Sequence, residues 1–208
     1  MFRHRTVILF LLLGIASSGH IQPSAAQSSI GTLVGTVNHP LLRRYPAVVY
    51  LESLDSTRFT VPKVNPVMDQ MNLMFTPHVL PVLKGSTIDF PNSDETRHNV
   101  YTSRSSVCQF ELGIYEEGIV KHVTCDKTGV ITVQCNVHAE MRGFIVVSPT
   151  PYFATTQKNG SFEIPAVPPG KYRVKFEHER LGLDPVEVTV VADSATTVVF
   201  GKPGRKRR

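Results

Sequence analysis

The stretch GVITVQCNVHAEMRGFIVV, residues 129–147, holds two β-like runs on either side of a short loop. In the first run, Ile131, Val133 and Cys135 fall on one face, because successive strand side chains point to opposite sides. The chain then bends and returns as GFIVV. This pattern predicts a strand–loop–strand unit in which the thiol of Cys135 ends an inward-facing apolar row.

The loop inside this stretch concentrates donor groups for a soft metal ion. His138 and Met141 follow Cys135 within six positions, and His98, in NSDETRHNVYT after the β-like run STIDF, is the candidate for a fourth donor. Zinc sites use Cys, His and carboxylate, whereas two His, one Cys and a weak axial Met are typical of blue-copper electron-transfer sites. Four protein donors leave no open position for a substrate, so we expect a protein that is not an enzyme.

The rest of the chain has the pattern of an all-β protein. Short runs rich in Val, Ile, Thr, Phe and Tyr include TLVGTV, AVVYLE, VLPVL, KHVTC, SFEIP, KYRVKFEH, VEVTVV and ATTVVF. Turn signals separate them, at Lys84-Gly85, Pro91-Asn92, Glu117-Gly118, Asn159-Gly160 and Pro169-Gly170. Many short strands with frequent turns predict β-sandwich or barrel architecture.

Residues 1–26 have the features of a cleavable export signal. Arg3 and Arg5 precede the apolar run TVILFLLLGIA, and the segment closes on the small residues of PSAA. The apolar run is about half of the roughly 20 residues that a membrane-spanning helix needs. No Cys stands at the expected cleavage point to carry a lipid. We therefore expect export to a periplasm-like compartment without stable membrane insertion.

The basic character of the chain lies at its two ends. Of the 22 Lys and Arg residues, two are in the signal and five are in the tail of residues 202–208, which leaves 15 against 17 acidic residues. A nucleic-acid-binding face would need positive charge on the fold itself, so we expect no nucleic-acid partner. The tail is interpreted as a disordered, solvated end, with docking to an acidic partner or a membrane surface as the alternative.

Several motifs together resemble one family. In chain order they are Phe75-x-Pro77, Gly85, FPNSD, His98-Asn99-Val100, Gly129, Cys135-x-x-His138-x-x-Met141 and Gly143. This order resembles the plastocyanin/amicyanin group of cupredoxins, and the short spacing between His138 and Met141 is similar to the amicyanin version. The whole chain resembles exported proteins often labelled methylamine utilization proteins, in which a cupredoxin domain is followed by a carboxypeptidase-regulatory-like β domain.

This resemblance implies a fold and a role for each motif residue. Residues 58–149 would form a cupredoxin Greek-key β-sandwich holding one type 1 copper ion. His98, Cys135 and His138 would be the equatorial ligands and Met141 the weak axial ligand. Asn99 would hydrogen-bond across to the loop that bears Cys135 and hold the two ligand segments together.

The implied function is electron transfer, with two alternatives. The leading hypothesis is a periplasmic carrier that passes one electron between redox partners, such as a dehydrogenase and a cytochrome. The second is copper storage or delivery with the same ligands. A hydrolytic role with Cys135 as nucleophile and His138 as base is the weakest, because no orienting acid or oxyanion site is evident in the sequence.

Residues 150–201 resemble a small transthyretin-like β-sandwich, with an Asn-Gly turn and a Pro-Gly turn between strands. The early runs in residues 27–57 resemble the opening strands of the same fold. One hypothesis is that residues 29–56 pair with 150–201, so that the cupredoxin is inserted between them. The alternative gives the early strands to the cupredoxin sandwich.

The other two cysteines are predicted to form a disulfide. A hairpin centred on Glu116-Glu117 would place Cys108 opposite Cys125, close enough for a bridge. Export permits the bond, and the pairing leaves Cys135 as a free thiol for a metal. The alternative is two buried free cysteines.

Two further features have open roles. His78 begins a predicted hairpin that would return near the loop bearing His98, where it could assist metal uptake, or it is an ordinary hydrogen-bonded edge residue. Met68, Met71 and Met74 are evenly spaced and could hold Cu(I) for loading, or they pack in a loop.

Overall fold

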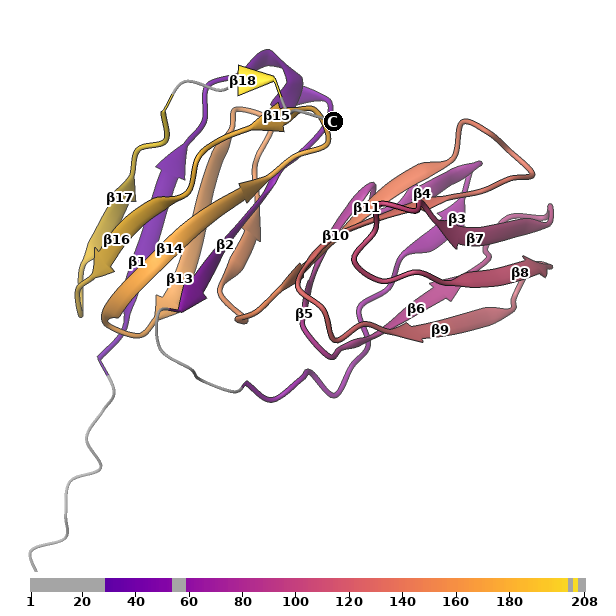
Figure 1. Cartoon of the computed structure of the whole chain (residues 1–208), viewed down its shortest axis with the longest axis horizontal. Helices are drawn as coiled ribbons and strands as arrows, with labels where there is room; N and C mark the ends of the chain where they lie inside the picture. The colour runs from indigo at the N-terminus through magenta and orange to yellow at the C-terminus, as the bar shows by residue number, and fades with distance from the viewer. Residues whose placement is uncertain (1–28, 54–58, 202–203, 206–208) are drawn as a thin grey trace, which may run out of the picture.

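The computed structural model describes residues 29–53, 59–201 and 204–205. The described chain is all-β, as predicted, and its strands form two lobes (Figure 1). Within these residues no helix is long and apolar enough to cross a membrane. The predicted export signal, residues 1–26, lies outside the described part of the chain.

The first lobe is a sandwich built around a five-stranded sheet in the order β5-β11-β10-β7-β8. Its strands are β5 (Val79–Leu83), β7 (His98–Thr102), β8 (Glu111–Tyr115), β10 (Gly129–Gln134) and β11 (Arg142–Ser148). Two strand pairs complete the lobe: β3 (Asp69–Met71) with β4 (Met74–Thr76), and β6 (Thr87–Pro91) with β9 (Val120–Thr124). β10 and β11 are antiparallel neighbours, so the predicted strand–loop–strand unit is confirmed.

The first core lies between these layers. Ile131, Val133 and Cys135 are all buried in it, which confirms the inward apolar row. Gly143, at the start of β11, packs tightly against this core, because a β-carbon there would meet the β-carbon of Phe75 at 2.9 Å. The donor-bearing loop therefore leaves and rejoins the sheet at the edge of a packed core.

The second lobe consists of two facing sheets. One has the order β13-β1-β17 and the other β12-β2-β14-β16. The strands are β1 (Gly31–Thr36), β2 (Val48–Ser53), β12 (Phe153–Thr155), β13 (Ser161–Val167), β14 (Gly170–Glu177), β16 (Val186–Val190) and β17 (Ala195–Val198), with the 3-10 helix η1 (Pro40–Arg43) between the first two. Leu33, Val49, Ile164 and Val174 are fully or almost fully buried between the sheets.

The early strands belong to the second lobe. β1 pairs with β13 and β17, and β2 lies between β12 and β14. This pairing is the one that the insertion hypothesis requires, and the alternative, which gave these strands to the first sandwich, is wrong. Gly204–Arg205 forms a short strand, β18, paired with β15 (Leu181–Gly182), so at these two positions the tail is not disordered as predicted.

A small apolar cluster joins the two lobes. Val48 and Tyr50 of β2 pack with Val79 of β5 and Val146 of β11, and all four are buried. The lobes also share a polar contact, in which Nε2 of His78 lies 3.2 Å from a carboxylate oxygen of Glu179. The two sandwiches are therefore packed against each other as well as linked by the chain.

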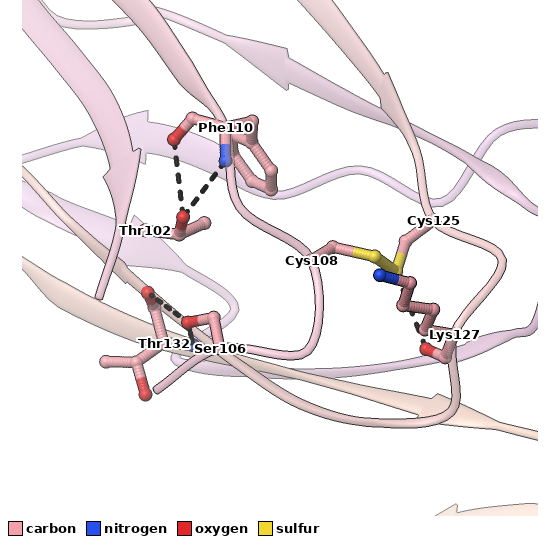
Figure 2. Close-up of a disulfide and its surroundings, with 7 residues drawn as sticks. All are labelled: Thr102, Ser106, Cys108, Phe110, Cys125, Lys127 and Thr132. Atoms are coloured by element: carbon pink, nitrogen blue, oxygen red, sulfur yellow. Dashed lines mark hydrogen bonds between the residues drawn. A yellow bond between two sulfur atoms is a disulfide. The ribbon is translucent and has the colours of Figure 1, made fainter. Parts of the chain in front are cut away.

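The disulfide between Cys108 and Cys125 is present, with a Cα–Cα distance of 6.1 Å (Figure 2). The hairpin from which we predicted it is wrong. β8 pairs with β7 and β9 pairs with β6, so the turn at residues 116–119 carries the chain from one sheet to another. The bridge thus links segments of different sheets, and Cys135 is the free thiol among the described residues.

Replacing both Cys108 and Cys125 by Ala should lower the free energy of unfolding by about 3 kcal/mol, because the bridge closes a loop of 17 residues and restricts the unfolded chain. Urea denaturation followed by circular dichroism measures the change. A loss below about 0.5 kcal/mol would contradict this reading of the bridge.

A protease site placed at the exposed residues 60–63 should give two pieces that stay together after cleavage. The amino-terminal piece supplies β1 and β2, each of which has strand partners on both sides in the second lobe. The cleaved chain should elute as one species in size-exclusion chromatography and separate only in denaturant. Separation under native conditions would show that the strand pairing is not as described.

Candidate metal centre

His98, Cys135 and His138 meet at one end of the first lobe. Their candidate ligand atoms all lie within 4.8 Å of one another. Sγ of Cys135 is 3.9 Å from Nδ1 of His98, and the Nδ1 atoms of the two histidines are 3.0 Å apart. The structure thus brings together three of the four predicted donors from segments 37 or more residues apart in sequence.

The loop between β10 and β11 is closed by its own backbone. The N–H of Met141 donates to the carbonyl oxygen of His138 at 3.0 Å. The N–H of Cys135 donates to the carbonyl oxygen of Met141 at 3.3 Å. These bonds join both ends of the loop, which fixes His138 beside Cys135. Met141 is 1% exposed at the end of this loop. Its ligation through the thioether stays a prediction.

The second ligand segment is tied to the loop by Asn99. Oδ1 of Asn99 accepts the backbone N–H of Asn136 at 2.8 Å. Asn99 follows His98 in β7, and Asn136 follows Cys135, so the bond joins the neighbours of two donors. It is the contact that the family resemblance implies for this asparagine.

Asp94 contacts the cluster, and sequence reasoning missed it. Its Oδ2 lies 2.8 Å from Nε2 of His98, which is 0% exposed. A neutral ring that donates from Nε2 to a carboxylate leaves Nδ1 free to bind a metal. The signal was available, because Asp94 is the acidic residue of FPNSD and stands four positions before His98.

Asp94 also holds the turn of the β3–β4 hairpin. Its carboxylate accepts the backbone N–H groups of Asn72 at 2.6 Å and Leu73 at 2.9 Å. Burial opposes the charged form, but the hydrogen bonds from Leu73, His98 and Asn72 outweigh it, so the pKa of Asp94 is lowered. An ionised carboxylate is therefore built into the support of the His98 ring.

Most of the cluster lies away from solvent. His98 and Cys135 are buried, whereas His138 is partly exposed. Tyr115, the partner of His98 in the β7–β8 register, donates its hydroxyl to the carbonyl oxygen of Phe90 at 3.1 Å. Burial raises the pKa of Tyr115, so this neighbouring phenol stays neutral.

The four residues with open roles lie in different places. His78 is outside the cluster and packs against the rings of Tyr45 and Phe144 in addition to its contact with Glu179. Met68 is buried in the first core, so the evenly spaced methionines do not form one three-membered group. Met71 and Met74 are exposed.

The donor set of the cluster fits copper better than a hard cation. It offers one thiol and two imidazoles, and no carboxylate of the described residues belongs to it. Thiolate and imidazole suit copper and zinc, whereas Mg²⁺ and Ca²⁺ require oxygen ligands. A buried methionine at the end of the same loop favours copper over zinc.

Comparisons with known proteins add the following. Residues 148–201 match the family model described as BOS complex subunit NOMO1-like, second beta sandwich domain. A reduced amicyanin variant is 21% identical, with 47% of this chain and 98% of that chain covered and a TM-score of 0.38. The Cu-containing nitrite reductase of Thermus scotoductus SA-01 is 20% identical, with 55% of this chain and 28% of that chain covered and a TM-score of 0.40. A search of curated protein sequences gave no significant match.

Replacing Asp94 by Ala should weaken metal binding by roughly 10- to 100-fold, because the His98 ring loses the acceptor that sets its orientation and tautomer. Competition with a chelator of known affinity measures the change. Ser93→Ala is the matched control, since Ser93 bonds to Asp69 and not to His98. Equal affinities for the two variants would remove Asp94 from the support of the site.

Proposed function

We propose that this protein is a type 1 copper electron carrier of the periplasm. The observation that carries the proposal is the cluster of one free thiol and two imidazoles, with a carboxylate oxygen of Asp94 2.8 Å from Nε2 of His98. Copper bound there would supply one-electron chemistry by alternating between Cu(II) and Cu(I).

The chain contributes a site that changes little when an electron arrives or leaves. Cys135 would bind as the thiolate, His98 and His138 through Nδ1, and Met141 as a weak axial donor. His98 is held by Asp94, and Asn99 holds the Cys135 segment, so neither needs to move. Little reorganisation favours fast electron transfer, and a buried thiol is protected from oxidation by solvent.

The route for the electron would be the edge of His138. It is the one member of the cluster that is not buried, and its neighbour Val137 is exposed on the same loop. An apolar surface beside a solvent-facing imidazole is suited to brief contact with a redox protein. We propose a dehydrogenase or a cytochrome as that partner, and the second lobe as a spacer or docking module.

Export through the signal of residues 1–26 would place the protein in the periplasm. The Cys108–Cys125 disulfide supports an oxidising compartment, because such bonds are rare where thiols are kept reduced. Copper storage or delivery is the second candidate function. The exposed Met71 and Met74 favour it, since thioethers bind Cu(I).

Reversible cycling separates the two candidates. An electron carrier should pass through repeated oxidation and reduction without losing copper, in the presence of a Cu(I) chelator of modest affinity. Metal counted by atomic absorption after each cycle provides the measurement. Copper handed to the chelator on each reduction would favour delivery instead.

The mature chain with Cu(II) should show an intense visible charge-transfer band and a narrow copper hyperfine splitting, because a thiolate ligand shares its electron density with the metal. Cys135→Ser should abolish the band, whereas Met141→Leu should keep it and raise the reduction potential, since removal of the axial thioether disfavours Cu(II). Absorption, electron spin resonance and voltammetry are the measurements. A Cu(II) complex whose thiol still reacts with a thiol reagent would refute the proposed site.

A further inference from the structure

The β3–β4 hairpin displays two thioethers that electron transfer does not use. Met71 and Met74 are directly opposed, as the last pair before the turn. They are 39% and 56% exposed, whereas Met68, three residues earlier, is 0% exposed. Met is among the residues most often buried, so two exposed thioethers on adjacent strands are unusual.

The two side chains share one face of the hairpin. Their strand neighbours Gln70 and Phe75 are also directly opposed, and both are buried. Because strand side chains alternate, Met71 and Met74 lie together on the outer face. The β-carbons of directly opposed residues are about 5 Å apart, and the flexible Met side chain allows both sulfur atoms to reach one cation.

The carboxylate of Asp94 links the turn of the hairpin to the metal cluster. Asn72 and Leu73 both have positive φ, at 56° and 59°, a conformation that is uncommon for leucine. Their N–H groups bond to Asp94, and Asp94 bonds to His98. Met71 and Met74 flank this strained turn, so the thioether pair is adjacent in sequence to the two residues that bond to Asp94.

Two of the three cluster residues are closed to an incoming cation, and His138 is partly exposed. His98 is 0% exposed and Cys135 is 3% exposed. A cation must exchange the ligands of its carrier for protein donors before it reaches them. Neutral thioethers select Cu(I) over zinc and over the hard cations that prefer oxygen.

We propose that Met71 and Met74 form a transient Cu(I)-binding site from which the cation passes to His98, Cys135 and His138. The destination of the cation rests on the proposed copper function. Copper stays Cu(I) throughout, so no electron is exchanged. The thioethers release no proton, and the proton lost from the Cys135 thiol when Cu(I) arrives goes to solvent.

Silver(I) tests the thioether site directly, as a diamagnetic analogue of Cu(I). The chain without residues 1–26 is labelled with 13C at the methionine methyl groups. It is then loaded with Cu(I) and titrated with Ag(I). The methyl signals of Met71 and Met74 should shift, while that of the buried Met68 should not. Unshifted Met71 and Met74 signals would overturn the proposal.

The rate of copper loading tests the transfer step. Cu(I) held by bicinchoninate is mixed with the metal-free chain, and the decay of the chelator complex is followed. The double variant Met71→Leu/Met74→Leu should load roughly tenfold more slowly, equivalent to about 1.4 kcal/mol, and reach the same final copper content. The control Met68→Leu should load at the unmodified rate, since volume-conserving exchanges preserve a core.

The outcomes separate this proposal from the electron-carrier proposal. An unchanged loading rate in the double variant, with Cu(I) still taken up, would refute transfer through the hairpin and leave the cluster as a copper site. The opposite result is a chain in which Ag(I) shifts the Met71 and Met74 signals but the cluster takes up no copper. That result would support the thioether site, but it would refute both the transfer of Cu(I) to the cluster and the proposed function.

Discussion

The hydrogen bond from the backbone N–H of Asn136 to Oδ1 of Asn99 is the constraint on which the candidate site depends. It is 2.8 Å long and joins segments 37 residues apart. Each segment carries a donor in the preceding position, so this contact and the pairing of β7 with β10 together hold His98 3.9 Å from Cys135. A buried polar group left without its partner costs about 1–3 kcal/mol, which is enough to favour closure of the two segments before any metal binds.

The second lobe acts on the same end of the sheet through His78. The carbonyl oxygen of His78 accepts the N–H of Phe144 at 2.9 Å, near the start of β11, and its ring contacts Glu179 of the second lobe. Burial opposes the charge of Glu179, but the contact with His78 and the charges of Arg180 and His178 outweigh it, so the pKa of Glu179 is lowered. The strand that follows the ligand loop is thus anchored on both lobes, which limits its freedom to shift.

The sequence predicted what local spacing determines and missed what depends on strand pairing. Alternation placed Cys135 at the end of a buried row, and the motif spacing brought His138 beside it. The hairpin around Glu116-Glu117 failed because a symmetric turn signal suits a crossing between sheets equally well. Asp94 was missed because its role depends on two contacts at once, with His98 and with a hairpin more than 20 residues earlier. Periodicity carries no information about such a meeting of three segments.

The insertion of one sandwich within the other has a physical rationale in the two ends of the inserted segment. The N–H of Leu51 donates to the carbonyl oxygen of Tyr152 at 3.0 Å, and the hydroxyl of Thr150 donates to that of Leu51 at 2.6 Å. The segment before the first lobe, at Leu51, therefore lies beside the segment that follows it, at residues 150–152. A domain whose ends are adjacent closes as a short loop in its host, and closure entropy grows only slowly with the length inserted. Once the first lobe is folded, β1 and β2 can reach their partners after residue 150 almost as readily as in an uninterrupted sandwich.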